Sequence, residues 1–246
     1  MKRFLKIYGI EQKLFFRSAD VFVFNLCMPV ATLVLIVMIA GGKAAGDSGM
    51  TYLQSAFASL ISVGICCSAF MSIPIVMVDY RDKKILKQFY CSPVSPACLL
   101  GADTLCSAVM AAISALLVFG VSVVCFGYRM QGNVFTFIAA WLLTLAAMFS
   151  IGLMIASLCR TVKVMNAVTS LVYFPMLFLS GATIPYEIFP KELQAAANVM
   201  PLTQGIKLMK SVSMGAGLAE GSYIVILLLV ITVICGIISV KTFRWE

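Results

Sequence analysis

The stretch Asp79–Pro96, DYRDKKILKQFYCSPVSP, is a densely charged island between two long apolar segments. Six of the chain's 28 charged residues (18 basic and 10 acidic) lie in its first nine positions. The flanking segments, Tyr52–Val78 and Leu99–Phe126, together contain one charged residue, Asp103. A charged connection between two membrane-spanning segments is where a membrane protein meets a soluble partner, so this stretch is the first place to look for function.

The composition places most of the chain in lipid. Apolar residues make up 62% and charged residues 11% of the 246 positions, whereas soluble domains carry roughly 25% charged residues. A soluble core of this size cannot bury so much apolar surface, and a helix crosses the bilayer with about 20 apolar residues. The sequence contains six such segments: Val21–Ala40, Tyr52–Val78, Leu99–Phe126, Val134–Leu158, Val164–Ile184 and Tyr223–Val240. The second and third are predicted to project beyond the bilayer.

Basic residues predict the orientation of these spans. If the N-terminus is cytoplasmic, 13 of the 18 basic residues fall in cytoplasmic segments and five in outer ones. This asymmetry agrees with the positive-inside rule, so both termini are predicted to be cytoplasmic. The net charge of +8 then reflects topology and attraction to anionic lipid, and it requires no nucleic-acid partner.

The sequence predicts no catalytic or metal site in this chain. It has no histidine, and none of its nine cysteines lies in a predicted outer loop, so we expect neither a disulfide framework nor a zinc site. A phosphate-binding loop of the pattern Gly-x-x-x-x-Gly-Lys-Ser/Thr is absent. Asp103 is the one ionisable group inside a span, and we interpret it as a carboxylate at the start of an interfacial helix. If the function consumes ATP, the nucleotide must therefore bind to another polypeptide.

The segment before the first span, residues 1–20, is predicted to be a basic amphipathic helix in the membrane interface. On a helical projection its five basic residues fall within one arc of roughly 100°, and apolar residues take most of the remaining circle. A simple membrane anchor and a helix that also contacts a partner both remain open.

The charged island is predicted to contain a short helix, Arg81–Tyr90, with two faces. The apolar face comprises Ile85, Leu86, Phe89 and Tyr90. The basic face comprises Arg81, Lys83, Lys84 and Lys87. Pro93 ends the helix, and Ser95-Pro96 opens the third span with a capping residue followed by proline. The alternative is a loop that its lysines hold near lipid headgroups.

A second irregular segment lies on the predicted outer side. Three of the eight prolines fall between residues 185 and 201, and such helix breakers in an apolar stretch need protein or water to satisfy the freed backbone groups. Glu187–Val199 and Leu202–Val212 are predicted to be two short helices that cap the outer mouth. The candidate outer-gate residues are Gly181, Pro185, Pro190 and Pro201.

The order of these motifs resembles that of type-2 ATP-binding cassette (ABC) permeases, the membrane subunits of drug, antibiotic and polysaccharide exporters. The resemblance rests on Ser92-Pro93-Val94-Ser95-Pro96 after the charged island, and on Ser180–Pro185 followed by Met200-Pro201-Leu202-Thr203 after the fifth span. It covers the whole chain. Met200 and Lys210 stand where this family frequently has Asn and Arg, which weakens any inference about polar contacts there.

The resemblance implies that residues 1–246 form a single, all-α permease domain with six transmembrane helices. It also implies an interfacial N-terminal helix, a cytoplasmic coupling helix between spans 2 and 3, and an extracellular re-entrant helical pair between spans 5 and 6. A separate ABC ATPase subunit would bind ATP and Mg and dock on the loop 79–98. A second permease would complete a homodimer or heterodimer in the bacterial plasma membrane, and this chain itself would carry no cofactor and no enzymatic activity.

Two stripes of small polar residues are candidates for the transport pathway. One face of the second span carries Ser59, Ser62 and Cys66. One face of the fifth carries Asn166, Thr169, Ser170 and Tyr173. Small residues at this spacing also serve close helix packing, so the pattern alone leaves both interpretations open. The family resemblance favours the pathway, because spans 2 and 5 line the central cavity in relatives.

The sequence therefore predicts the permease subunit of an ATP-driven exporter. The uncharged, weakly polar stripes favour an amphipathic or hydrophobic cargo, such as a drug, a peptide antibiotic or a lipid-like compound. The alternatives are an exporter of polysaccharide or another cargo of the same family, and a membrane sensor or scaffold that moves nothing.

Overall fold

The computed structural model describes residues 2–17, 23–40, 52–84, 96–128, 130–159, 161–181, 189–218 and 221–242. Every regular element within these ranges is helical. The α-helices are α1 (Lys2–Arg17), α3 (Met28–Ala40), α4 (Tyr52–Cys67), α5 (Ile73–Asp82), α7 (Pro96–Phe126), α8 (Val134–Leu158), α9 (Val162–Leu179), α10 (Lys191–Val199), α11 (Pro201–Ser213) and α12 (Ser222–Thr242). Two π-helical segments, η1 (Val23–Cys27) and η3 (Ser68–Ser72), precede α3 and α5.

The all-helical membrane fold is confirmed. Among the described residues, five helices are long and apolar enough to cross a membrane: Ala56–Asp82, Leu99–Phe126, Val134–Leu158, Val162–Leu179 and Ser222–Thr242. The first predicted span contains a shorter apolar helix, Asn25–Leu35. Helices dominate because hydrocarbon offers no partner for backbone N–H and C=O groups, and a helix pairs them internally.

The observed helices overlap the predicted spans, but several ends differ: the second continues to Asp82 where Val78 was predicted, and the fifth ends early. α8 has the predicted bounds, and α7 begins at Pro96, the residue predicted to open it. The fifth span was predicted to reach Ile184, but α9 ends at Leu179. That prediction is wrong because Gly181 has φ 79°, a left-handed conformation that commonly ends helices.

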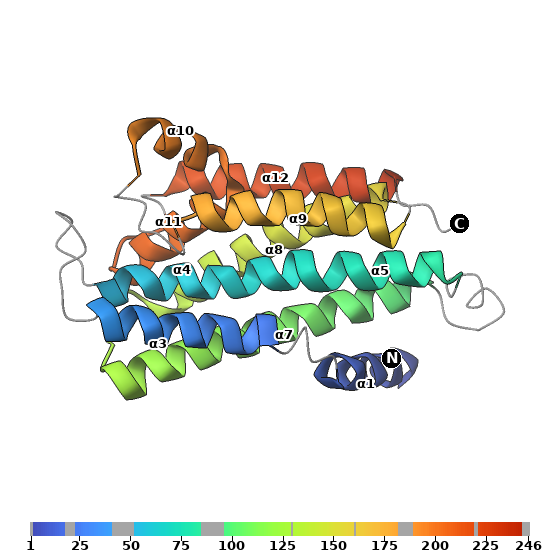
Figure 1. Ribbon diagram of the computed structural model, residues 1–246, viewed down its shortest axis with the longest axis horizontal. Helices are drawn as coiled ribbons and strands as arrows, with labels where there is room; N and C mark the ends of the chain where they lie inside the picture. The colour runs from blue at the N-terminus through green and yellow to red at the C-terminus, as the bar shows by residue number, and fades with distance from the viewer. Residues whose placement is uncertain are drawn as a thin grey trace.

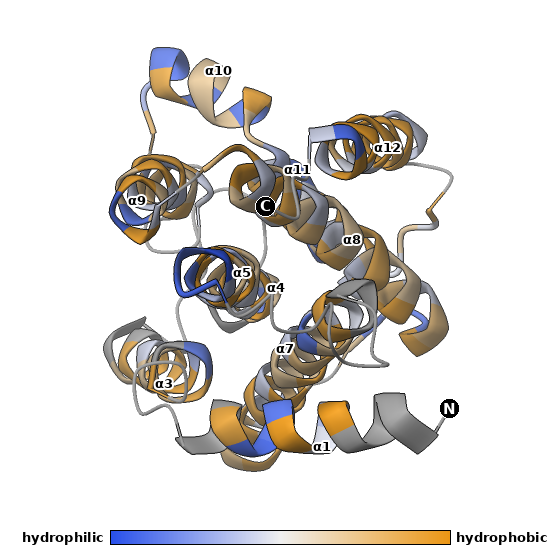
Figure 2. Ribbon diagram, turned by 90° about the vertical axis from the view of Figure 1, so that its right-hand side faces the viewer, coloured by the Kyte–Doolittle hydropathy of each residue, from blue (hydrophilic) through white to orange (hydrophobic). Residues whose placement is uncertain are grey.

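The continuous segment α4–η3–α5 is the central element of the bundle. Figure 2 shows α3, α7, α8 and α9 arranged around it. Of the most apolar stretch of Ala56–Asp82, 83% is buried, against 11% for Ser222–Thr242. α12 therefore lies at the periphery, where its apolar side chains face the membrane, while α4–η3–α5 faces protein.

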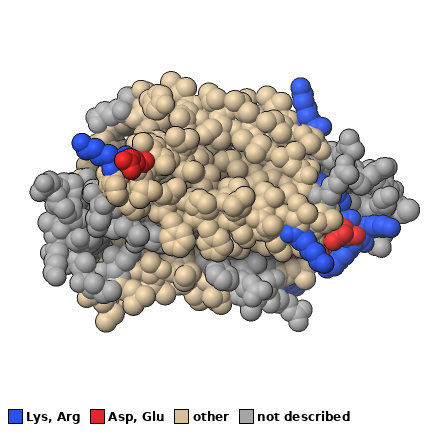
Figure 3. Space-filling view, turned by 45° about the horizontal axis from the view of Figure 1, so that its top comes forward, with Lys and Arg blue, Asp and Glu red and all other residues tan. Residues whose placement is uncertain are grey.

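The two ends of the bundle differ in what they carry. α1 and the last turns of α5 and α12 lie at one end, together with the turn between α8 and α9; this end is here called the α1 end (Figure 1). α10 and α11 lie at the opposite end, here called the α10 end. In Figure 2 the spans are seen nearly end-on, whereas α1 lies across the α1 end. On the face in Figure 3, the charged side chains among the described residues lie toward the two ends.

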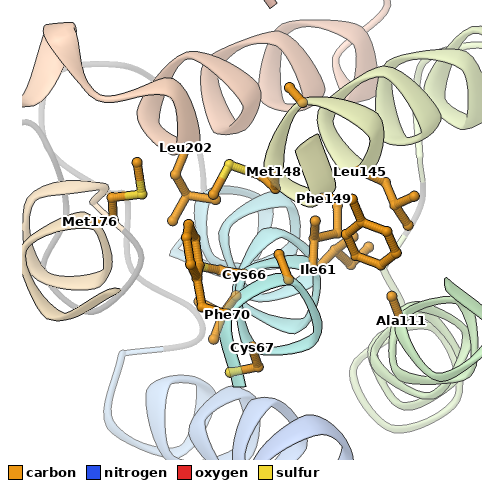
Figure 4. Packing of buried hydrophobic residues seen from close by; sticks show 14 of the residues in the cluster. Ile61, Cys66, Cys67, Phe70, Ala111, Leu145, Met148, Phe149, Met176 and Leu202 are labelled. Atoms are coloured by element: carbon orange, nitrogen blue, oxygen red, sulfur yellow. The ribbon is translucent and has the colours of Figure 1, made fainter. Parts of the chain in front are cut away.

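Large side chains and glycines together allow the central helix to pack closely. Phe70 and Cys66 face Met148 of α8, Met176 of α9 and Leu202 of α11 in Figure 4. Where backbones approach most closely, only glycine fits. A Cβ on Gly152 of α8 would overlap the carbonyl oxygen of Ala69 in η3.

We predict that Gly152→Ala destabilises the bundle, because the added methyl group must displace the backbone of η3. Overpacking of this kind costs about 1–3 kcal/mol, which lowers the thermal unfolding temperature by several degrees in a chain of this size. The matched control is Gly120→Ala in α7, where a Cβ meets nothing within 4 Å. Melting curves of both variants in detergent provide the test, and equal unfolding temperatures for both would refute the close approach.

Candidate functional site

A buried acidic junction connects α1 to the bundle. It consists of Glu11 of α1, Tyr80 of α5 and Asp103 of α7. Glu11 is 5% exposed and Asp103 1% exposed. The Tyr80 hydroxyl donates a hydrogen bond of 2.8 Å to Glu11 Oε1, and the carboxylate of Asp103 is close enough to interact electrostatically with Glu11. Neither oxygen of Asp103 has a hydrogen-bond partner in the described part of the chain.

This junction corrects the interpretation of Asp103. The sequence suggested an interfacial carboxylate at the start of a helix, but α7 begins seven residues earlier, at Pro96, and the Asp103 side chain is buried. Burial also raises the pKa of Glu11, although the hydrogen bond from Tyr80 lowers it in part. The Glu11 carboxyl, shielded from water in this way, favours binding a proton.

The structure describes only some of the predicted coupling residues, namely those at the end of α5 and directly after it. Arg81 belongs to the last turn of α5, and its Nη1 donates a 2.9 Å hydrogen bond to the carbonyl oxygen of Cys159. Lys83 forms an exposed ion pair of 2.8 Å with Asp79. Arg81 therefore connects the end of α5 to the turn between α8 and α9, a contact that sequence periodicity did not predict.

The prediction of one helix over Arg81–Tyr90 is wrong at its start. α5 ends at Asp82, the backbone N–H of Lys84 donates to the carbonyl of Arg81, and Lys84 has φ 56°. A left-handed residue interrupts the run of helical hydrogen bonds, so no helix continues through this position. The remaining coupling candidates lie outside the described residues: Ile85, Leu86, Phe89, Tyr90 and Pro93.

The stripe in the second span is buried inside the protomer. Ser59, Ser62 and Cys66 are each at most 3% exposed. The Ser62 hydroxyl donates to the carbonyl of Ala58 within the same helix, at 2.8 Å. Within one copy of the chain, these small side chains allow neighbouring helices to pack closely on α4.

The stripe in the fifth span is split between two environments. Tyr173 and Thr169 are buried, and the Tyr173 hydroxyl lies 3.1 Å from Cys67 Sγ in a side-chain hydrogen bond. Asn166 is exposed and Ser170 is partly exposed. Within one protomer, Tyr173 connects α9 to the central helix, the Thr169 hydroxyl donates to Met165 Sδ of α9 itself, and Asn166 lies on the outer surface.

Two short helices lie at the α10 end, and α11 spans Pro201–Ser213 where Leu202–Val212 was predicted. α10 begins at Lys191 rather than Glu187, with Pro190 at its N-cap, and Pro201 is the first residue of α11. α11 is largely buried and packs against α8 and α4, whereas only Ala197 of α10 is buried. Gly181 terminates α9, and Pro185 lies outside the described residues.

A buried polar pair was missed by the sequence analysis. The Ser68 hydroxyl donates a 2.8 Å hydrogen bond to Asn25 Oδ1, and both side chains are fully buried. Asn25 belongs to η1 and Ser68 to η3, so the contact joins the two π-helical segments. The available signal was the single amide in the apolar segment 21–40; for the acidic junction it was Glu11, the one acidic residue of α1.

Comparison with known proteins identifies the family. Residues 4–214 match the family described as ABC-2 type transporter. This chain belongs to the ABC-2 type transporter family. Nodulation protein J of Rhizobium leguminosarum bv. trifolii is 30% identical over 96 residues, which is 39% of this chain and 37% of that protein. The aligned stretch thus spans little more than a third of the relative's length.

Membership makes the chain a membrane component of the ABC-2 type transporter family, in agreement with the five candidate membrane spans among the described residues. In the described part of this ABC-2 chain, no group of three or more His, Cys, Asp or Glu residues comes together to hold a metal ion. Its polar chemistry lies instead in hydrogen bonds between helices: at the acidic junction, at the Asn25–Ser68 pair and at the Cys67–Tyr173 pair.

We predict that the docking of α1 on the ABC-2 bundle weakens as pH rises. The pKa of Glu11 is raised above its ordinary 4.5 when α1 is docked, so the docked state binds more protons and its stability falls as pH rises from that value through the raised pKa. A spin label at Lys13→Cys, an exposed position of α1, should become more mobile over this range. Glu11→Gln should abolish the pH dependence, and an unchanged profile in that variant would exclude Glu11 as its source.

We predict that Tyr173 supports stability, not cargo choice. Tyr173→Phe removes the hydrogen bond with Cys67 and should cost about 1 kcal/mol. Tyr173→Ala leaves a cavity and should cost about 3–5 kcal/mol. Asn166→Ala, at an exposed position of the same helix, is the control and should leave the protomer's melting curve unchanged. A changed cargo profile in Tyr173→Phe at normal stability would instead assign the residue to the pathway.

Proposed function

We propose that this ABC-2 chain is the permease subunit of an ATP-driven exporter. Its cargo is an amphipathic or hydrophobic compound, such as a drug, a peptide antibiotic or a lipid-like molecule, which it moves out of the cytoplasm or the inner leaflet. A separate ABC ATPase binds ATP and Mg, and a second permease, identical or similar, completes the pathway.

The apolar middle of the bundle carries this proposal. The acidic and basic residues of the five candidate spans lie close to their ends: Asp79, Arg81, Asp82, Asp103, Lys163 and Lys241. Ion-driven transporters place ionisable groups along the membrane pathway, whereas here the buried middle offers hydroxyl, thiol and amide groups. An uncharged interior suits an apolar cargo. Because it offers no ionisable group to carry a coupling ion, the energy for transport would come from a bound ATPase.

We further propose six membrane crossings with both termini in the cytoplasm. η1 and α3 supply the sixth crossing, which lies beside α4 and α7 in Figure 1. α1 then lies in the cytoplasmic interface, and α10 and α11 form an outer re-entrant pair. The gathering of α1, the end of α5 and the α8–α9 turn at one end supports this topology, because these segments carry most of the basic residues.

The exposed face of α9 is proposed to meet the second permease. Asn166 lies on it together with Leu171 and Phe174, which are strongly exposed in one protomer. An amide on a lipid-facing surface lacks hydrogen-bonding partners, so a neighbouring protein surface is the better environment for it. The candidate pathway residues at this interface are Asn166 and Ser170. The second-span stripe, Ser59, Ser62 and Cys66, would instead pack inside the protomer and hold the helices that carry them.

The segment after α5 is proposed to dock into the ATPase. It leaves the bundle at the α1 end, next to the hydrogen bond between Arg81 and the carbonyl of Cys159. A movement of this segment would therefore be transmitted directly to α5. Through the hydrogen bond of Arg81 it would also be transmitted to the turn between α8 and α9. Gly181, Pro185, Pro190 and Pro201 would flank the opposite, outer opening.

The proposed orientation can be tested with cysteines at two exposed positions. Glu192→Cys on α10 should react with a membrane-impermeant thiol reagent added outside whole cells, because α10 is expected outside. Lys83→Cys at the end of α5 should react only after the cells are opened. The reverse pattern would invert the topology and remove the docking argument.

Transport and coupling are tested together with Phe89→Ala. Loss of a buried phenylalanine costs about 1.5–3 kcal/mol, so ATPase co-purification should weaken by a factor of roughly ten or more, and ATP-dependent cargo uptake into inverted vesicles should fall with it. Lys83→Ala is the control, since an exposed ion pair contributes about 0–1 kcal/mol. Normal assembly and transport in Phe89→Ala would refute docking through this residue.

A fully assembled wild-type complex that transports no member of a chemically diverse panel would favour the alternative function, a membrane sensor or scaffold.

A further inference from the structure

A preformed apolar cavity opens on the side of the bundle between α7 and α8. Its volume is about 310 Å³. Residues from α4, α7, α8 and the loop before α8 line it, among them Ile61, Ala115, Phe119, Met130, Phe137 and Trp141. The indole N–H of Trp141 is the one hydrogen-bonding side-chain group among the lining residues, so the cavity presents hydrocarbon almost exclusively.

Rigid aromatic packing keeps this cavity open. Phe57 of α4 lies 5.7 Å from Phe137 and 6.0 Å from Phe119, measured between ring centroids, and stacks on Tyr128 at 4.4 Å. Of these rings, Phe119 and Phe137 line the cavity together with the buried Ile61, and Phe57 packs against both rings. The space arises where α7 contributes the small side chain of Ala115 opposite α8. Collapse would require the aromatic cluster to repack, so the cavity belongs to the fold.

The rim of the cavity faces the bilayer. Leu116 of α7 is 69% exposed, and Val134 and Ile138 of α8 are 54% and 47% exposed. All three lie inside the candidate spans Leu99–Phe126 and Val134–Leu158. Apolar side chains exposed within a span meet lipid hydrocarbon, so the cavity is continuous with the lipid-facing surface.

We propose that this cavity binds an acyl chain of a membrane phospholipid. An empty space beside hydrocarbon loses dispersion contacts on both its wall and its mouth, and the acyl chains that surround the protein are flexible enough to fill it. The volume is at the lower limit of small-molecule pockets, which span about 300–1,000 Å³, and suits part of a chain better than a whole amphipathic cargo molecule. The lining has no charged group for a headgroup, so the headgroup stays in the interface.

The cavity also lies apart from the face proposed for the second permease. α9 and the α7–α8 pair occupy different sides of the central helix in Figure 2. The inference therefore does not depend on transport direction, on cargo or on the ATPase. The bound acyl chain would hold α7 and α8 apart at a fixed distance.

Tryptophan fluorescence tests the proposal directly, because the chain has two tryptophans, Trp141 and Trp245. In the Trp245→Phe variant, Trp141 is the sole tryptophan, excited selectively at the red edge of the absorption band, and it lines the cavity. Phosphatidylcholine with brominated acyl chains is titrated into the detergent-solubilised protein. We expect saturable quenching of at least about twofold at low lipid-to-protein ratios, since bromine quenches only on contact.

Two further variants in the Trp245→Phe background distinguish the cavity from surrounding lipid. Ala115→Phe fills the space and should remove the saturable component, while Ala139→Phe, at an exposed position of α8 outside the lining, should leave it unchanged. Equal quenching in Ala115→Phe and its parent, or quenching that rises linearly without saturation, would overturn the proposal. Quenching that appears only when the protein is diluted to monomers would assign the cavity to a second copy, and reversal by a transported compound would assign it to cargo; either result would also overturn it.

Discussion

The seating of α4–η3–α5 in the middle of the bundle is the constraint on which the rest of the structure depends. In lipid, apolar side chains gain little by leaving the solvent, so close packing and hydrogen bonds between helices must hold the bundle together. The central helix meets this demand through the approach of Gly152 to Ala69 and through bonds from Ser68 to Asn25 and between Cys67 and Tyr173. These contacts join α8, η1 and α9 to the central helix.

The contacts gather around a single π-helical segment. η3 begins at Ser68, directly after Cys67, and η1 carries Asn25. A π-helical turn holds an extra residue and shifts the faces that follow it, so the side chains of α5 are rotated relative to those of α4. In its first half the central helix therefore presents small residues to its neighbours. In its second half Tyr80 contacts α1, and Arg81 contacts the turn between α8 and α9.

The periphery follows from the same arrangement. Once the central helix takes the protein-facing positions, α7, α9 and α12 must expose apolar side chains to the membrane. α1 cannot enter the bundle because of its basic residues, and it attaches to the α1 end through Glu11 and Tyr80. The carboxyl of Asp103 beside this contact is buried, and neither of its oxygens has a hydrogen-bond partner in the described part of the chain.

The sequence by itself determined the membrane class, the bounds of α8 and the start of α7, because hydropathy and proline act locally and hydrocarbon permits few alternatives to a helix. It also carried the family motifs, which the match over residues 4–214 bears out. Only the tertiary structure decided that Asp103 is buried, that Tyr173 faces Cys67 while Asn166 faces outward, and that Lys84, two residues after the end of α5, has a left-handed conformation. Periodicity reveals which residues share a helix face, but the neighbour that this face meets depends on residues far away in the chain.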